Sequence, residues 1–320
     1  MAHKNSEKIS SKKSTIAVIL LILTTILWGT SFIITKNITQ EVPIFFFIGL
    51  RFGIAFLGFF PFFFQLKKLN KETLLMGLIT GIIYFFGFTI QTTGLQTTTA
   101  GKTGFITGLS AILVPFIAWL GFKNPLSKRI WGAVALSVIG MAFLLLEGES
   151  GVILGDLIVL VSAIFWAFYI ILNDKFVNQV NIYAYSIIQT FIVSIFGFIS
   201  SLIFKEQYVS ISFSLEFWFI IFYMGIIVMS LTIIFQNWSQ KYQGATQTAI
   251  IFTLEPVFAA LFGFILGREI LTLFGWIGCS LIFIAILLSV LKRTHIKSLK
   301  YNKLSEEMRK NSRKEKVETD

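Results

Sequence analysis

Glu255 is the ionisable side chain in the apolar part of this sequence that is best placed for chemistry. It stands near the middle of an apolar run and is followed by Pro256. A carboxylate surrounded by hydrocarbon is costly, and such groups are functional by default. Two interpretations stay open: Glu255 exchanges protons or attracts an amine, or it is a hydrogen-bonded carboxyl that braces the chain where Pro256 interrupts a helix.

Two stretches carry aromatic and polar residues at the helical spacing i, i+4, i+7 and i+11. The first has Thr24, Trp28, Ser31 and Thr35, and the second has Ser162, Trp166, Tyr169 and Asn173. Indole rings and a phenol suit amphipathic or cationic solutes. Because unpaired polar groups are costly against lipid, both stripes are expected to face a cavity or protein. The alternative is that the hydroxyls join helices by hydrogen bonds.

Other polar residues within apolar runs complete the candidate binding set. Gln91, Gln236 and Gln247 carry amides that can orient the polar groups of a solute. Lys102 can meet an anionic group or extend to the membrane surface. Arg51 is expected to lock onto a neighbouring carbonyl or carboxylate. The predicted substrate-binding residues are Trp28, Ser31, Gln91, Lys102, Thr107, Trp166, Tyr169, Gln236, Gln247 and Glu255.

The sequence offers little for catalysis, metal binding or nucleotide binding. Both His residues lie near the chain ends, and Cys279 is the single Cys, which removes disulfides within the chain and His-ligated metal sites from the apolar body. The stretch Gly101-Lys102-Thr103 matches the end of a phosphate-binding loop, but Gln96 stands where that loop needs a Gly. We therefore expect no cofactor and no metal site.

Membrane-spanning helices are the elements expected to position these residues. Of 320 residues, 55% are hydrophobic and 13% charged, with a mean hydropathy of +0.81. Because the apolar runs are apolar all round, they differ from the amphipathic helices of a soluble protein. The first run lacks a small-residue cleavage site and is expected to be retained. Ten runs are long enough to span a bilayer: 15–35, 43–64, 74–94, 98–120, 129–146, 155–173, 183–204, 215–237, 244–266 and 272–291.

The net charge of +11 is concentrated at the chain ends. Residues 1–14 contribute +3 and residues 292–320 contribute +5, so nucleic acid is not an expected partner, since a nucleic-acid domain carries basic residues on its folded surface. If the N-terminus is cytoplasmic, the cytoplasmic segments hold 22 Lys and Arg residues and the opposite loops hold 3. The positive-inside rule then places both termini in the cytoplasm of a multi-pass protein in the plasma (inner) membrane.

The two halves of the sequence resemble one another. A shift of 138 residues aligns the two aromatic stripes, and a shift of 145 aligns Gln91 with Gln236 and Lys102 with Gln247. Each half has five spans, and five is odd, so the second half is expected to be upside down relative to the first. Inverted repeats of this kind are typical of transporters. The fold class is thus all-α integral membrane, with ten transmembrane helices as two inverted five-helix repeats.

Several motifs give the sequence a family resemblance. The motifs are Ile26-Leu27-Trp28-Gly29-Thr30-Ser31-Phe32, Leu50-Arg51-Phe52, the stretch 99–109, and Leu254-Glu255-Pro256-Val257-Phe258 followed by Gly267-Arg268-Glu269. With these, residues 15–291 resemble the EamA-like family of the drug/metabolite transporter superfamily. The resemblance implies a ten-span carrier, often an exporter of amino acids, drugs or other small metabolites, with a central cavity.

The sequence thus predicts a secondary transporter in the lipid bilayer. It would move a small organic solute (amino acid, amine or drug-like), by export, through a central cavity between the repeats, with Glu255 as a candidate for proton coupling. The expected units are a cytoplasmic segment 1–14, repeats 15–146 and 155–291, and a basic cytoplasmic tail 292–320. An intramembrane lipid-modifying enzyme and a non-transporting membrane receptor are the alternatives.

Overall fold

The computed structural model describes residues 2–122, 127–145, 153–208, 211–267 and 273–290. These residues form helices joined by short turns, with no strand among them. The predicted basic tail 292–320 and the residues Arg268-Glu269 of the last motif lie outside the described residues. The all-helical prediction is confirmed for the part of the chain that is described.

The first half consists of six α-helices and one 3-10 helix. They are α1 (Ala2–Ile38), α2 (Ile44–Gly58), η1 (Phe60–Lys68), α3 (Lys71–Leu95), α4 (Ala100–Gly108), α5 (Ser110–Phe122) and α6 (Lys128–Leu145). Helix α3 begins where the Asn70 side chain accepts a hydrogen bond from the Thr73 backbone N–H, and Thr99 caps α4 in the same way. Helix α1 also includes most of the predicted N-terminal segment 1–14, which is therefore helical.

The second half follows a similar order of helices, but its described residues include no counterpart of η1 and add a π-helix. It contains α7 (Leu154–Phe176), α8 (Ile182–Ile203), α9 (Leu215–Phe222), η2 (Tyr223–Leu231), α10 (Thr232–Gln243), α11 (Ala245–Phe252), α12 (Glu255–Gly267) and α13 (Leu273–Val290). The segment η2 is a π-helix inside an otherwise continuous helical run. The helical run therefore extends beyond the predicted span 215–237, because α10 continues to Gln243.

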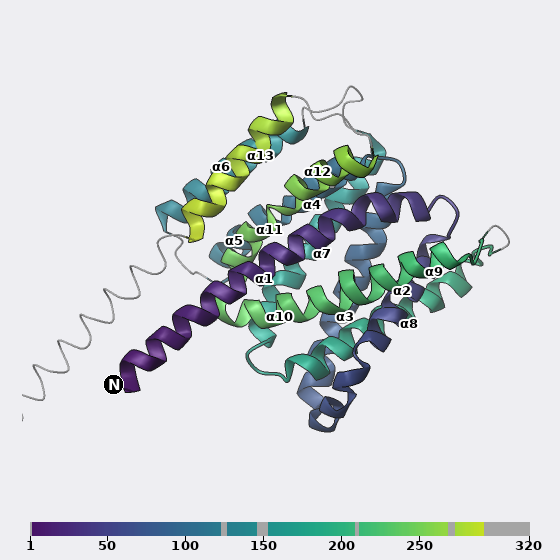
Figure 1. The fold of residues 1–320 in the computed structure, drawn as a ribbon, viewed down its shortest axis with the longest axis horizontal. Helices are drawn as coiled ribbons and strands as arrows, with labels where there is room; N and C mark the ends of the chain where they lie inside the picture. Colours follow the sequence, from purple (N-terminus) through teal and green to yellow (C-terminus); the bar gives the residue numbers. More distant parts are fainter. Residues whose placement is uncertain (1, 123–126, 146–152, 209–210, 268–272, 291–320) are drawn as a thin grey trace, which may run out of the picture.

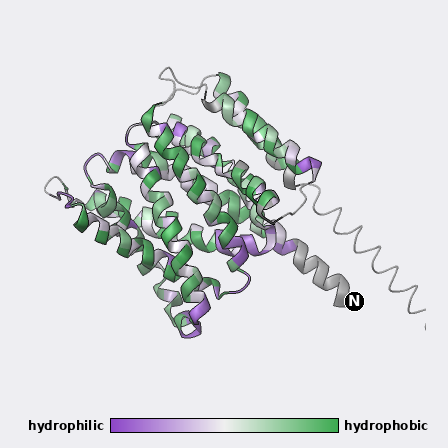
Figure 2. Ribbon diagram, turned by 180° about the vertical axis from the view of Figure 1, so that it is seen from behind, coloured by the Kyte–Doolittle hydropathy of each residue, from purple (hydrophilic) through white to green (hydrophobic). Residues whose placement is uncertain are grey.

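Seven helical stretches of the described chain are long and apolar enough to cross a membrane, or eight if the bent pair α2 and η1 counts as one span. The axes of that pair meet at 77°. Helices α6 and α13 lie where the fifth and tenth crossings are predicted, and the count of ten stays a prediction. Large apolar side chains such as Leu57, Leu202 and Leu215 are exposed, and hydrophobic residues predominate along the helices (Figure 2).

The helices of one half pack mainly on helices of the other half. Helix α1 packs on α10 and α12, and its counterpart α7 packs on α3 and α5. Helix α2 packs on α8, α4 packs on α12, and α6 lies beside α13, with that last pair at one edge of the bundle (Figure 1). These pairings keep their pattern when each helix is exchanged with its counterpart in the other half.

The crossing of α2 and α8 depends on two glycines. A Cβ on Gly197 would lie 2.6 Å from the backbone nitrogen of Gly49 and 2.7 Å from its Cα. Real Cβ atoms do not approach backbone atoms so closely, so these helices touch through their backbones. The sequence places Gly49 and Gly53 one turn apart, and Gly53 also faces α8 at Ser194, which agrees with small residues allowing close crossings in membranes.

We therefore predict that Gly197→Ala destabilises the protein. The added methyl must push α2 away from α8, and overpacking of this kind costs about 1–3 kcal/mol. The thermal unfolding midpoint of the purified protein in detergent should fall. The matched control is Gly132→Ala in α6, where nothing lies within 4 Å of the added Cβ and the midpoint should hold or rise. Equal behaviour of the two variants would contradict the close crossing.

Candidate functional site

A small buried cavity lies among α1, α3, α7 and α12. Its lining consists of Trp28, Ser31, Phe32, Phe88, Gln91, Trp166 and Glu255. Five of these residues are among the ten predicted to bind substrate. The structure therefore brings together side chains from both halves of the sequence. Trp28 and Glu255, for example, are separated by more than 220 positions.

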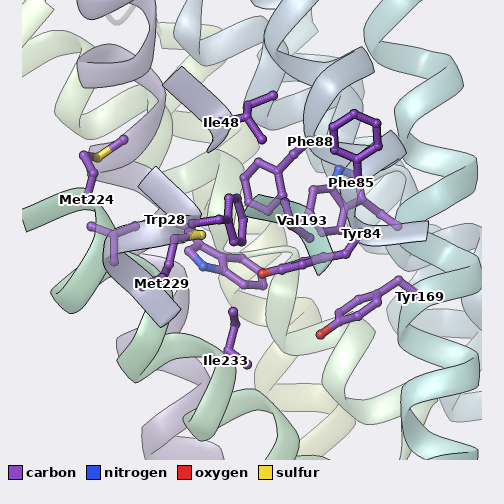
Figure 3. Packing of buried hydrophobic residues seen from close by; sticks show 14 of the residues in the cluster. Trp28, Ile48, Tyr84, Phe85, Phe88, Tyr169, Val193, Met224, Met229 and Ile233 are labelled. Atoms are coloured by element: carbon purple, nitrogen blue, oxygen red, sulfur yellow. The ribbon is translucent and has the colours of Figure 1, made fainter. Parts of the chain in front are cut away.

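Aromatic rings form most of the cavity wall. The ring centroids of Trp28 and Trp166, one from each half, lie 6.4 Å apart. Phe88 meets Trp166 edge to face at 4.9 Å, and Phe252 lies 4.9 Å from Trp28 on its other side. Figure 3 shows Trp28, Phe88 and their apolar neighbours converging on one region. Such a wall offers several π faces to a solute.

The polar groups at the cavity differ in whether the protein satisfies them. The indole N–H of Trp28 donates to the Thr232 hydroxyl at 3.0 Å, and the Gln91 amide donates to the Thr107 hydroxyl at 2.7 Å. Thr107, a predicted site residue, thus orients Gln91. By contrast, the indole nitrogen of Trp166 is buried and has no hydrogen-bond partner among the described residues. That N–H is an unused donor on a residue that lines the cavity.

Glu255 is the one ionisable side chain in the cavity lining, and it is the first residue of α12. It is 7% exposed, and no described residue forms an ion pair or hydrogen bond with its carboxyl group in this structure. The preceding helix α11 ends at Phe252, so Glu255 stands directly after a two-residue interruption. The interpretation of Glu255 as a hydrogen-bonded brace therefore finds no side-chain partner in the described chain.

Helix breaks occupy corresponding positions in the two halves. The interruption before Glu255 falls at Thr253 and Leu254, and α4 and α5 are separated at Leu109. A shift of 145 residues, the one that relates Gln91 to Gln236, carries Leu109 onto Leu254. Paired discontinuous helices in the two halves are the best pointer to a transporter's binding site.

Tyr169 lies behind the cavity wall and joins it to a buried polar network. Its ring stacks on Tyr84 at 4.5 Å, and its hydroxyl accepts from the Gln189 amide at 3.4 Å. The network continues from Gln189 through Asn237 to Asn173. Tyr169 is therefore placed next to the site but does not line the cavity.

Lys102 lies beside an anionic group, one of the two environments predicted for it. It is buried at the start of α4, with its Nζ 3.9 Å from the carboxylate of Asp156 at the start of α7. Asp156 also accepts a hydrogen bond from the Thr98 hydroxyl at 2.5 Å. The anionic group beside Lys102 in this structure belongs to the protein, and a role of Lys102 in binding a solute stays a prediction.

The two remaining candidates are not cavity residues in this structure. Gln236 is fully buried on α10, where its amide lies 3.4 Å from the Gln240 side chain. Gln247 is half-buried on α11. The internal sequence match paired Gln91 with Gln236, but only Gln91 lines the cavity, so the two halves differ in their contribution to the site.

Sequence reasoning missed Phe32, Phe88 and Tyr84. The sequence contains 36 Phe residues, and nothing in their spacing distinguishes the two that reach the cavity. The predicted lock for Arg51 is also wrong: the guanidinium contacts the Thr35 hydroxyl and phenyl rings, and no carbonyl or carboxylate of the described residues.

The cavity has a volume of about 30 Å³. A water molecule needs roughly 10–15 Å³ by this kind of measure, whereas pockets for small organic ligands span about 300–1,000 Å³. The structure therefore shows the site in a closed form with room for a few atoms, and an organic solute requires the walls to move apart.

Comparison with known proteins agrees with this architecture. The sequence model of the EamA-like transporter family matches residues 15–146 and again residues 153–291. An uncharacterized transporter of Archaeoglobus fulgidus is 32% identical over 274 residues, covering 85% of each chain. The uncharacterized transporter YyaM of Bacillus subtilis is 25% identical, covering 69% of this chain and 74% of its own length.

A solved structure supports the fold. One crystal structure superposes with a TM-score of 0.67, covering 86% of this chain and 96% of the other, at 16% sequence identity. That likeness concerns the fold alone. Because the family match covers both halves and the A. fulgidus relative is similar along most of its length, this chain belongs to the EamA-like transporter family and is a multi-pass membrane transporter of the drug/metabolite transporter type.

Proposed function

We propose that this protein is a secondary carrier that exports a small organic solute bearing an amine by alternating access. The solute binds in the cavity between the two Trp rings, with its ammonium group at Glu255. Two inverted repeats of five spans each would provide two similar packings, one open to each side of the membrane. The observation that carries the proposal is a buried carboxyl that has no partner among the described residues and shares a cavity with Trp residues from both halves.

The position of the cavity supports alternating access. Its lining comes from α1 and α3 of the first half and from α7 and α12 of the second. A motion of one half against the other must therefore change the cavity. Since the present cavity has a volume of about 30 Å³, we take this structure as a closed state through which the carrier passes.

The chemistry of the lining supports an amine as the recognised group. A carboxylate and several aromatic faces both attract a cation, and each attraction is stronger where water is excluded. The unpaired indole N–H of Trp166 adds a donor for a polar atom of the solute. Ser31 and Gln91 supply further polar contacts at the cavity edge.

The charge distribution supports an orientation. With 22 Lys and Arg residues on one side and 3 on the other, both termini would lie in the cytoplasm and the protein in the plasma membrane. On this topology Lys102 and Asp156 lie near the outer surface. Their pairing would then help to close the outer side of the cavity.

Transport itself is tested by flux in proteoliposomes. We expect the purified protein to move at least one member of a panel of amines, amino acids and cationic drugs faster than liposomes without protein. An inward proton gradient should accelerate the exit of the solute if protons are coupled. A protein that retains its helical content and unfolding midpoint in the liposomes but moves no member of the panel would count against the proposal.

A second prediction concerns Glu255→Gln. The amide keeps the shape of the side chain but removes its charge and its titration, so the affinity for an amine should fall roughly tenfold or more. The pH dependence of flux should also disappear, because Glu255 is the one titratable residue in the lining; Tyr84 and Arg51 lie behind that wall. Ser280→Ala is the control. Ser280 lies on α13 and does not line the cavity, so this variant should show normal flux.

If Glu255→Gln leaves both the flux and its pH dependence as in the unmodified protein, Glu255 neither couples protons nor binds the amine. A loss of affinity with an unchanged pH profile would keep the amine site and remove the coupling role.

A further inference from the structure

Arg51 is a buried cation whose hydrogen-bonding capacity is largely unused. It lies on α2 and is 1% exposed. Its Nη1 donates to the Thr35 hydroxyl at 3.4 Å, whereas its Nε and Nη2 have no hydrogen-bond partner in the described part of the chain. A guanidinium carries five N–H donors. No carboxylate of the described chain lies within ion-pair distance of it, so its charge has no counter-ion in this structure.

Aromatic rings surround the guanidinium without satisfying it. Its central carbon lies 5.2 Å from the ring centroid of Phe88 and 5.8 Å from that of Phe47. Cation–π attraction offsets part of the cost of burial, but a ring face accepts no strong hydrogen bond. Removing a charge from water costs several kcal/mol unless an opposite charge and hydrogen bonds compensate it. A group of this kind is suited to an anion that arrives from outside the protein.

Phe88 connects Arg51 to the cavity. One part of its ring lies next to the guanidinium, and the same residue lines the cavity that contains Glu255. Tyr84 lies at the same boundary, because its ring meets Phe88 at 5.0 Å and Trp166 at 5.3 Å. Its hydroxyl is also buried without a partner. A movement of the Phe88 ring would therefore join two unpaired donors to the space beside Glu255.

We propose that Arg51, with Tyr84, forms an anion-binding subsite that receives a carboxylate of the transported solute when Phe88 moves aside. The proposal rests on the proposed function, since it places the subsite next to the amine site at Glu255. Arg51 and Glu255 then hold the two opposite charges of one zwitterionic solute. Arg51 fits this role because its planar fork can bind both oxygens of a carboxylate.

A purely structural role for Arg51 explains the contacts less well. A structural arginine in a membrane protein uses its donors on carbonyls or carboxylates of neighbouring helices, and Arg51 uses one donor, on a hydroxyl. An ordered water can accept from Nε or Nη2, but it leaves the charge uncompensated. An anion both accepts these hydrogen bonds and compensates the charge of the guanidinium.

The test compares three probes that share a phenyl ring: benzylamine, phenylacetate and phenylglycine. They carry the amine, the carboxylate, or both. The binding of each probe to the full-length protein in nanodiscs is measured by calorimetry at a constant salt concentration. A separate series of measurements varies the concentration of sodium chloride. We expect the unmodified protein to bind phenylglycine at least roughly tenfold more tightly than benzylamine, which is the value of a hydrogen bond to a charged group.

The variants separate the two subsites. Arg51→Gln should abolish the preference for phenylglycine over benzylamine and leave the affinity for benzylamine within about twofold. Arg51→Lys keeps the charge and should retain part of the preference. Glu255→Gln should weaken the binding of benzylamine, whereas the binding of phenylacetate should persist. The unfolding midpoint of each variant is recorded, so that a loss of fold is recognised.

Three results would overturn the subsite. The first is equal affinity of the unmodified protein for phenylglycine and benzylamine, a comparison that needs no variant. The second is an unchanged preference in a folded Arg51→Gln protein. The third is that chloride raises the unfolding midpoint of the protein and phenylacetate does not, which would make Arg51 a site for an inorganic ion. In each case benzylamine binding and flux can persist, so the proposed function would stand; if none of the probes binds or moves, the proposed function itself fails.

Discussion

The bilayer offers no hydrogen-bond partners, and the arrangement of polar residues in this protein follows from that constraint. Many polar side chains of the helices are buried inside the bundle, where helices of one half supply partners for helices of the other. The Trp28 indole of α1 donates to the Thr232 hydroxyl of α10, and the Gln189 amide of α8 donates to the Thr80 hydroxyl of α3. Large apolar side chains such as Leu57, Leu202 and Leu215 are exposed, which suits contact with lipid.

Four of the residues that depart from this rule lie at or next to the cavity. Glu255 and Trp166 line it, and the Glu255 carboxyl and the Trp166 indole nitrogen have no partner among the described residues; Arg51 and the hydroxyl of Tyr84 lie behind its wall with donors unused by that part of the chain. Leaving such groups unpaired lowers stability, and proteins keep them where function requires it. Their common location gives the cavity a physical reason to take up a polar solute, beyond the family's general association with transport.

Much of the candidate site was predictable from residue spacing. The stripes through Trp28 and Trp166 recur at helical intervals, and all their members are buried, because polar groups at that spacing share one helix face. Glu255 was recognisable as a rare charge in an apolar run. Phe88 was not, since an apolar residue in an apolar helix carries no mark of which neighbour it will meet. An anionic group beside Lys102 was one of two predictions, but its identity as Asp156 was not predictable, because Asp156 lies 54 positions away in the other half.

The sequence by itself determined that the chain is a helical membrane protein of a transporter family, because hydropathy, charge bias and local motifs act over short stretches and survive without tertiary information. Only the tertiary structure decided which residues meet. Contacts between α1 and α12, or between α3 and α7, join positions far apart in the chain, and their geometry depends on how closely helices cross, as Gly49 and Gly197 show. The unused donors Nε and Nη2 of Arg51 are likewise a property of the packed bundle, because they depend on which acceptors the described helices bring near and not on the residue itself.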